Sequence, residues 1–537
     1  MQTSPSTSSP RALVRYALPL VLGVAVALLQ WGNGWAADGP AAAPVAALDT
    51  TETDTTLEAR DQRRAFVSAD SLSTVIEDDE TLRHLFGNVY VRQNETHLYS
   101  DEATHFVDES EYLFMGNVVI IEETDTLRAD TVRYDEREEV GRARSNVWLT
   151  DGEVDIRSPR AIHYSQEGRS VFLDGVTLED SASTLLSEEG EYFSDEERAD
   201  FVGDVRFTDP ETYLESDSIT YFRATDDTDA RGNVSIERRG GHEEVAAEDD
   251  TTARTYLFGD RARSEDEGAY SRIDGNALLL QIETDSLGVP EDTLFISAER
   301  IDAAQSDSLR RLTAIGSARA WQRDIASTAD SMVYDRILED DQVAHEESRL
   351  YYDPFAWFED AQVSGDRIRV AAQNRSVDTV FVRENAFAAE LDTTVDRIHQ
   401  LKGRDITGYF EDEELQLLDV EHNAEAIRFL TEEGVSEPDG ATEASGDRIL
   451  ARFADSELDE IVFLEGIRGS YYPRAEVPDP LELDGLRWRP EERPIKSEYM
   501  DDDRVRPWLE SPPLVMDPGA SADQLQDREE PAPLADD

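Results

Sequence analysis

Apolar and polar residues alternate along much of the chain, and this alternation recurs every 29 residues. Steps of 29 from Gly87 reach Gly116, Ser145, Asp174, Gly203 and Gly232. A valine stands two positions after each of these residues, and a second apolar residue stands four positions after it. The twelve apolar positions are Val89, Val91, Val118, Ile120, Val147, Leu149, Val176, Leu178, Val205, Phe207, Val234 and Ile236. A period of two predicts strands with one buried face, and the leading Gly-Asn or Gly-Asp favours a turn or kink where each strand starts.

Each repeat also predicts a second strand. Eleven positions after the repeat's first residue come Leu98, Leu127, Ile156, Leu185 and Leu214, and an aromatic residue or histidine follows at His105, Tyr134, His163, Tyr192 and Tyr221. Between them lies a pair such as Ser100-Asp101 or Ala129-Asp130. We expect the small residue to allow close backbone packing and the acidic residue to cap a bend, which is a structural rather than a catalytic role.

The repeats predict an all-β fold, an elongated stack of antiparallel hairpins. The spacing is regular over residues 66–240, looser over 241–430, and returns over 447–494 after a loop at 431–446. Residues 495–537 are rich in Asp, Glu and Pro and are expected to form a tail. Repeats of this size bury little apolar surface alone, so their stability is expected to come from stacking on neighbours.

The N-terminus has the features of a secretory signal. Residues 1–37 contain Arg11 and Arg15, then an apolar run of roughly a dozen residues, then small residues. That run is short for a membrane span, which needs about 20 residues, although an uncleaved anchor stays open. Residues 38–65 are expected to be a flexible leader. The mature protein is therefore predicted to leave the cytoplasm.

Composition excludes several classes of function. The 537 residues include 51 Lys and Arg against 119 Asp and Glu, a formal charge of −68. Such a charge repels phosphate backbones, so the chain is not expected to bind nucleic acid. The absence of cysteine excludes disulfides and thiolate metal sites. Only Lys402 and Lys496 are lysines, a balance that suits a halophilic, high-salt setting or reflects drift of composition in the lineage.

No motif points to catalysis, a metal or another cofactor. The sequence has neither a phosphate-cradling Gly-Lys-Ser/Thr loop nor a Gly-x-Ser-x-Gly elbow. His97 and His105 would share a face if one strand ran through both, but no third ligand accompanies them. We therefore expect no catalytic residue, no metal site and no enzyme.

The valine-lined interior has two interpretations. It is either a closed, filled core or a partly filled groove that accepts acyl chains. Open sheet edges would also invite pairing with other chains.

The repeat resembles that of the OstA-like family. The residues that carry the resemblance are Gly116-Asn117-Val118-Val119-Ile120 with Leu127-Arg128-Ala129-Asp130 and Tyr134, and Gly203 to Phe207 with Leu214 to Tyr221. Residues 401–410 and 483–494 resemble the larger OstA-like proteins of Bacteroidetes-type bacteria. The resemblance covers about residues 66–494.

This resemblance implies a periplasmic β-jellyroll, either free or associated with the outer membrane, that carries lipopolysaccharide or a related glycolipid. Its partners would be other jellyroll components, joined edge to edge, and the outer-membrane assembly protein. The twelve apolar positions would then contact lipid. The alternatives are an elongated structural or adhesive envelope protein with a filled core and, less favoured, a β-solenoid enzyme that acts on polysaccharide.

Overall fold

A computed structural model describes residues 65–507. Within that range it leaves out residues 78–79, 123–124, 153, 182, 211, 226, 240–251, 266–268, 285–289, 307, 324, 340–341, 359, 374–375, 412–413, 432–436 and 455–456. The expected signal sequence, nearly all of the expected leader, and the tail beyond residue 507 lie outside the described residues. No helix in the described part of the chain is long and apolar enough to cross a membrane.

The chain forms two compact bodies, and both consist almost wholly of antiparallel strands. The N-terminal body contains the described residues up to Ile236 together with residues 261–265. The C-terminal body contains the described residues of 237–260 and those from 269 onward. The prediction of an all-β fold of stacked antiparallel hairpins is confirmed in each body.

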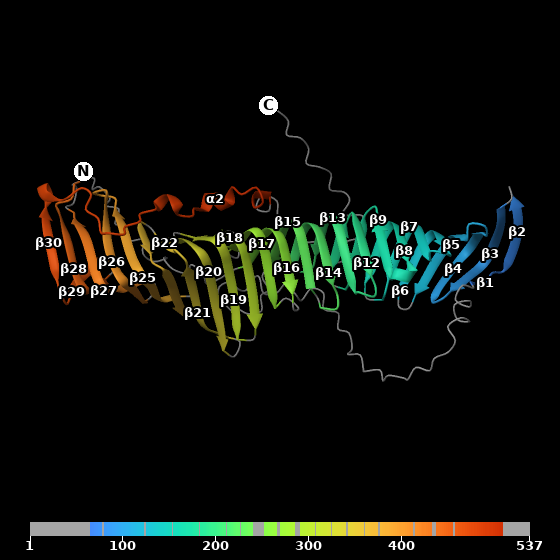
Figure 1. The fold of residues 1–537 in the computed structure, drawn as a ribbon, viewed down its shortest axis with the longest axis horizontal. Coiled ribbons are helices and arrows are strands. Elements are labelled where there is room, and N and C mark those ends of the chain that lie inside the picture. Colours follow the sequence, from blue (N-terminus) through green and yellow to red (C-terminus); the bar gives the residue numbers. More distant parts are fainter. Residues whose placement is uncertain are drawn as a thin grey trace, which may run out of the picture. The chain divides into compact units, whose positions relative to one another are not determined.

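In the N-terminal body the strands follow one another in chain order (Figure 1). They are β1 (Phe66–Ser68), β2 (Ser71–Glu77), β3 (Glu80–Gln93), β4 (Thr96–Phe106), β5 (Glu111–Glu122), β6 (Asp125–Asp135), β7 (Val140–Thr150), β8 (Asp155–Tyr164), β9 (Arg169–Leu173), β10 (Val176–Glu179), β11 (Thr184–Ser187), β12 (Glu189–Phe193), β13 (Arg198–Thr208) and β14 (Thr212–Phe222), with a short 3₁₀ turn, η1 (Ser165–Glu167). The strands β15 (Asp227–Arg239) and β16 (Thr252–Glu265) each have residues in both bodies. At the N-terminal end, the long strand β3 pairs with both β1 and β2.

The C-terminal body repeats this arrangement. Its strands are β17 (Tyr270–Thr284), β18 (Pro290–Ser306), β19 (Leu309–Gln322), β20 (Ile325–Glu339), β21 (Gln342–Tyr351), β22 (Phe355–Phe358), β23 (Ala361–Ser364), β24 (Arg367–Gln373), β25 (Ser376–Asp392), β26 (Arg397–Glu411), β27 (Glu414–Leu430), β28 (Gly440–Ala454), β29 (Glu457–Leu464) and β30 (Arg468–Pro473). At its end β28 pairs with both β29 and β30. Because β28 begins at Gly440, the connection after β27 is shorter than the loop expected over residues 431–446.

The Gly-Asn pairs bend the strands in the middle rather than starting them. In β5 the pairing with β6 shifts register between Met115 and Val118. Gly116 and Asn117, which lie in this gap, have φ values of +75° and +46°. The left-handed region is open to glycine and is tolerated by asparagine, so the sequence places the bend at this point of the strand.

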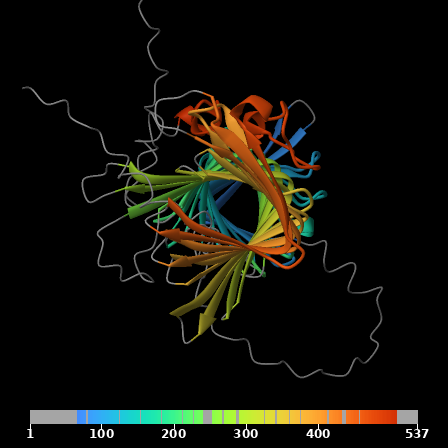
Figure 2. The same ribbon diagram turned by 90° about the vertical axis from the view of Figure 1, so that its left-hand side faces the viewer.

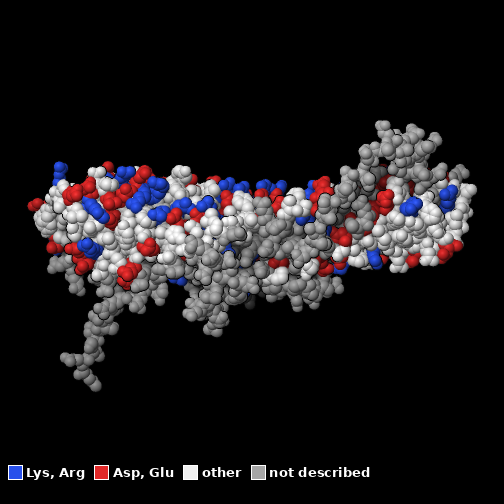
Figure 3. All heavy atoms as spheres, turned by 90° about the horizontal axis from the view of Figure 1, so that it is seen from below, with Lys and Arg blue, Asp and Glu red and all other residues white. Residues whose placement is uncertain are grey.

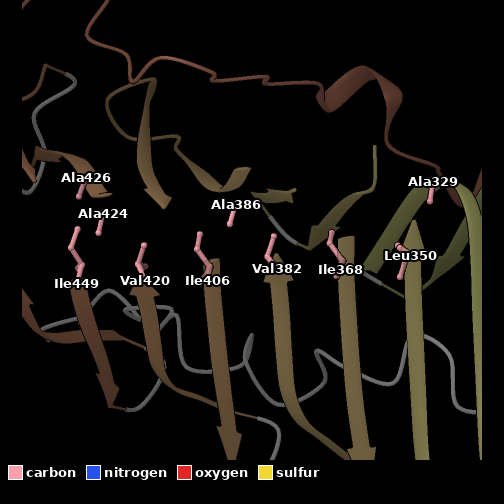
Figure 4. Close-up of a cluster of buried hydrophobic side chains, with 10 residues drawn as sticks. All are labelled: Ala329, Leu350, Ile368, Val382, Ala386, Ile406, Val420, Ala424, Ala426 and Ile449. Carbon is pink, nitrogen blue, oxygen red and sulfur yellow. The ribbon is translucent and has the colours of Figure 1, made fainter. Parts of the chain in front are cut away.

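The bends divide the long strands into two arms, and the arms of successive strands form two walls. Figure 2 shows such arms diverging in the orange and brown strands of the C-terminal body. Apolar side chains fill the space between the walls there. Figure 4 shows Ile406, Val420 and Ile449 in a row on one wall, facing Ala386, Ala424 and Ala426 on the other. These side chains form a packed core between the two walls.

A strap that follows β30 covers the outer face of one wall of the C-terminal body. It comprises residues 474–507 and includes the 3₁₀ turns η2 (Arg474–Glu476) and η3 (Pro490–Glu492) and the helix α2 (Lys496–Met500), so strands do not continue to residue 494 as expected. Leu483 of the strap packs with Phe387 and Phe429. Tyr499 stacks on Phe295 of β18 with ring centroids 4.6 Å apart.

Candidate functional site

The twelve apolar positions singled out by the repeat all lie in the interior of the N-terminal body. They come in pairs from β3, β5, β7, β10, β13 and β15. Each of these side chains is at most 5% exposed, and Phe207 is the most exposed of them. Their placement on the inner face follows from the bend: the residues that come two and four positions after Gly116 point inward, because the strand resumes its alternation after Asn117.

Strand register joins the second position of each pair from β3 to β13 into one continuous apolar row. Ile120 of β5 lies opposite Leu98 of β4 and Leu127 of β6. Leu127 in turn lies opposite Leu149 of β7. The row continues through Ile156, Leu178, Leu185, Phe207 and Leu214. The apolar residues of the second predicted strand thus complete the lining between the twelve positions.

A second apolar row lies on the opposite wall, and the sequence analysis missed it. Its largest members are Phe114, Phe172 and Phe201, which are at most 1% exposed. Phe114 pairs with Ala103 and Val132 on the neighbouring strands. The repeat carries a signal for this row, because Leu85, Phe114, Ala143, Phe172, Phe201 and Ala230 each stand two positions before the repeat's first residue.

Polar residues border the interior on the side of the turns. The repeated aromatic or histidine positions lie here, and His105, Tyr134 and His163 are at most 9% exposed. His105 stacks on Tyr112 with ring centroids 4.1 Å apart, and its Nε2 lies 3.2 Å from an oxygen of Glu136. Each wall therefore changes from apolar to polar as it approaches the turns.

The turns of the two walls meet along what we call the polar seam. The seam consists of Gln93, Asn94, Glu122, Asp125, Glu136, Glu139, Asp151, His163, Ser194 and Arg223. At one end Asn94 Nδ2 donates to Glu139 Oε1 over 3.0 Å, and Gln93 Nε2 donates to the carbonyl oxygen of Glu136 over 2.9 Å. At the other end Arg223 donates to Asp151 over 2.5 Å. These partners lie on strands or turns that are not neighbours in the sheet, so the contacts join one wall to the other.

Glu122 and His163 form the most buried contact of the seam. Nε2 of His163 lies 2.7 Å from Oε2 of Glu122, and Nδ1 lies 2.9 Å from the hydroxyl of Ser170. Thr96 donates to the other oxygen of Glu122. Burial alone would raise the pKa of Glu122, but the hydrogen bond and charge of His163 outweigh it, together with the hydroxyl donors, and lower the pKa to about 2. Glu122 is therefore an ionised carboxylate at neutral pH.

Oε1 of Gln93 lies next to the seam, in a residue that is 6% exposed, and has no hydrogen-bond partner among the described residues. The hydroxyl of Tyr134, a residue that is 1% exposed, is also buried there, close to the hydroxyl of Ser165. Burial raises the pKa of Tyr134, the nearby charges of Glu139, Glu122 and Glu136 raise it further, and Ser165 offsets only part of the rise. The hydroxyl of Tyr134 thus stays protonated beside several carboxylates.

The expectation that His97 and His105 would share a face is wrong. One strand, β4, does run through both residues. However, its pairing with β5 shifts register between Tyr99 and Glu102, which reverses the alternation. His97 contacts Tyr90, while His105 is buried against Glu136. In the part of the chain that the structure describes, no group of three or more acidic or histidine residues is placed to hold a metal ion.

Acidic and basic side chains alternate on the described outer surface. On the face seen in Figure 3, Lys and Arg atoms lie next to Asp and Glu atoms over much of the C-terminal body. Cross-strand ion pairs include Arg311 with Asp335 and Arg448 with Asp419, in which the arginine is exposed and the aspartate is buried.

The geometry defines a class of protein: a roll of stacked antiparallel hairpins whose two walls enclose an apolar interior. Residues 62–217 match the family model of the OstA-like protein. This match confirms the resemblance to the OstA-like family for the N-terminal body. No curated protein matches the chain.

Proposed function

We propose that the protein is a non-enzymatic periplasmic carrier or scaffold in lipopolysaccharide transport to the outer membrane. In this proposal the interior of the N-terminal body holds the acyl chains of lipopolysaccharide or a related glycolipid. The twelve positions from Val89 to Ile236 would contact those chains. The family of residues 62–217 supports the pathway.

The observation that carries the proposal is the continuous apolar row between the walls. It runs without a charged residue from Val91 of β3 to Leu214 of β14. An acyl chain of any common length would find apolar partners throughout such a row. On the side of the turns, side chains rather than a backbone ladder close the interior.

The proposed partners are other jellyroll components of the transport pathway and the outer-membrane assembly protein. They would join the stack at its terminal strands by edge-to-edge pairing. The exposed apolar side chains of β2 support this part of the proposal, because Leu72 and Ile76 are 60% and 75% exposed at the N-terminal end.

Uptake of labelled lipopolysaccharide by the purified protein tests the proposal. Val118→Asp places a carboxylate in the apolar interior, two residues from Ile120 of the row, and is expected to abolish uptake. Val119→Asp is the matched control, because Val119 is the neighbouring residue on the opposite face of β5. Val118→Phe fills the interior without adding charge and should also reduce uptake, and circular dichroism verifies that each variant is folded. Equal uptake by all four proteins would refute an acyl site at this row.

A structural envelope protein with a filled core is the second candidate. The observation that favours it is tight packing: a cavity in the C-terminal body, lined by Ile296, Leu312 and Leu350, has a volume of about 20 Å³. That is room for a single water molecule. A protein that is lipid-free as purified and takes up no lipopolysaccharide would establish this candidate.

A further inference from the structure

Four arginines stand side by side on the outer face of one wall of the N-terminal body. Arg133 of β6 lies directly opposite Arg142 of β7, and Arg144 of β7 lies directly opposite Arg160 of β8. Arg142 and Arg144 flank the buried Ala143, so both point outward from β7. All four arginines are exposed. We call these four residues the arginine quartet.

The centre of the arginine quartet carries positive charge that no carboxylate compensates. Like charges directly opposite each other on neighbouring strands are destabilising. Among the described residues, no carboxylate forms an ion pair with Arg142 or Arg144. Asp130 stands next to Thr131, which lies opposite Arg144, but its carboxylate accepts a hydrogen bond from Asn146 at the bend. The two central guanidinium groups are therefore free to bind an anion.

The two outer members of the quartet are held by carboxylates that lie outside it. Arg133 forms an ion pair with Glu111 of β5, on one side of the quartet. Arg160 forms an ion pair with Asp174, which follows β9, on the other side. A guanidinium group has five N–H donors, so each of these arginines keeps donors beyond those that its carboxylate occupies. The carboxylates thus position the outer arginines without neutralising the centre.

A second group of four arginines, in the C-terminal body, shows the neutralised form of this arrangement. Its members lie on β21, β24 and β25 in two directly opposed pairs, and they are Arg349, Arg367, Arg369 and Arg383. Each of them forms an ion pair with a nearby acidic residue, and these residues are Asp335, Glu347, Glu384 and Asp405. The arginine quartet of the N-terminal body lacks such partners at its centre, so the stability of the sheet does not explain it.

We propose that the arginine quartet is a binding site for a bisphosphorylated sugar. Guanidinium groups bind phosphate through paired, parallel hydrogen bonds. Neighbouring strands lie about 4.8 Å apart and alternate residues of one strand about 6.8 Å apart, so the midpoints of the two opposed pairs are separated by about 8 Å. One phosphate group cannot engage both pairs, whereas two phosphate groups on one sugar can. The site lies outside the apolar interior and does not depend on the proposed carrier function.

The acidity of the whole chain does not oppose this site at physiological salt. The formal charge of −68 is spread over 537 residues. At physiological ionic strength the Debye length is about 8 Å, so exposed charges further away than this are largely screened. A small ligand that sits on the quartet is therefore governed by the four arginines. A nucleic acid, by contrast, would extend from the quartet onto acidic surface, and its exclusion stands.

Calorimetric titration of the whole chain with fructose 1,6-bisphosphate at physiological ionic strength tests the site. We expect one molecule to bind, at least about tenfold more tightly than fructose 6-phosphate, which carries a single phosphate group. Arg142→Gln combined with Arg144→Gln should weaken binding at least about tenfold. The matched control is Arg92→Gln combined with Arg128→Gln. It removes the same charge from two exposed arginines of the opposite wall, which also have no ion pair among the described residues, and it should leave the affinity unchanged.

Each outcome decides one part of the proposal. Equal weakening by the two double variants would overturn the site, because binding would then follow net charge alone. Equal affinity for the two sugar phosphates would overturn the requirement for two phosphate groups. A wild-type protein that binds neither sugar phosphate would overturn the site outright. Circular dichroism verifies that each variant is folded, and lipid uptake by Val118→Asp judges the carrier function separately.

Discussion

Asn117 donates a hydrogen bond from Nδ2 to Oδ2 of Asp101 on the neighbouring strand, 2.8 Å away, across the bend of β5. The contact recurs in both bodies. Its other examples are Asn88 with Asp70, Asn146 with Asp130, Asn233 with Asp217 and Asn385 with Asp366. One side-chain contact thus fixes the bend from strand to strand, and it explains why the repeat pairs Gly-Asn with a small residue followed by Asp.

The glycines of the bends should not tolerate substitution by a residue that has a Cβ atom. At Gly116 an added Cβ would lie 2.6 Å from Oδ2 of Asp101, and φ is +75°. We expect Gly116→Ala to destabilise the N-terminal body by about 2 kcal/mol or more. The causes are backbone strain and displacement of Asp101 from its hydrogen bond with Asn117. Urea denaturation measures the change.

Ser145 provides the control for this prediction. It occupies the equivalent place in the repeat with φ of +61°, so its backbone is strained but its Cβ is already accommodated. Ser145→Gly should therefore stabilise the protein, by up to about 1 kcal/mol. If both substitutions change stability in the same direction, the account of the bend is wrong.

The second apolar row should carry as much packing energy as the row found from sequence. Phe114 is fully buried, and Phe114→Ala is expected to cost about 3–5 kcal/mol. Phe86→Ala, at a residue of β3 that is 44% exposed, should cost well under half of that. Thermal unfolding of both variants checks the difference, and similar losses would mean that Phe114 is not a core residue.

Acid should weaken the seam through Glu122. Its pKa is lowered from 4.5 to about 2 in the folded protein, so its stabilising effect is complete above pH 4.5 and is lost as the pH falls from 4.5 towards 2. The loss amounts to about 3.4 kcal/mol at most. Glu122→Gln should remove this part of the acid dependence. The check is the free energy of unfolding of both proteins, measured by denaturation between pH 5 and pH 2.5. If it falls by the same amount in both, the contact with His163 does not stabilise the fold.

Two buried glutamines hold the C-terminal strap. Gln400 donates to the carbonyl oxygen of Leu481 over 3.1 Å and accepts from the amide of Leu483 over 2.7 Å. Gln362 makes the corresponding pair of contacts with Arg487 and Arg489. Gln400→Ala should expose the amide of Leu483, which hydrogen exchange would register as at least a tenfold loss of protection. Gln373→Ala, on the exposed end of β24, is the control that should leave that amide protected.

The extent to which the sequence predicted the structure depended on the range of each interaction. The twelve inward positions were predictable because a period of two and a spacing of 29 act within one strand and its neighbours. The row around Phe114 has the same spacing, but Ala143 and Ala230 weaken its apolar pattern.

The seam and the strap had no comparable signal. Glu122 meets His163 across 41 positions and Asp151 meets Arg223 across 72, so no fixed spacing marks these pairs, and the twist of the stack decides them. The strap lacks any period, and its anchors Gln362 and Gln400 are single polar residues in otherwise ordinary strands. The face of His105 was mispredicted for a related reason, because the irregularity in β4 reverses the alternation.

The most direct test of the central claim is native mass spectrometry, with lipid extraction, on protein purified from the cells that make it. The account predicts a mass excess that corresponds to an acylated glycolipid, and that excess should be absent from folded Val118→Asp protein and present in Val119→Asp protein. A lipid-free protein that also fails to take up labelled lipopolysaccharide would contradict the account and leave the interior as a filled core.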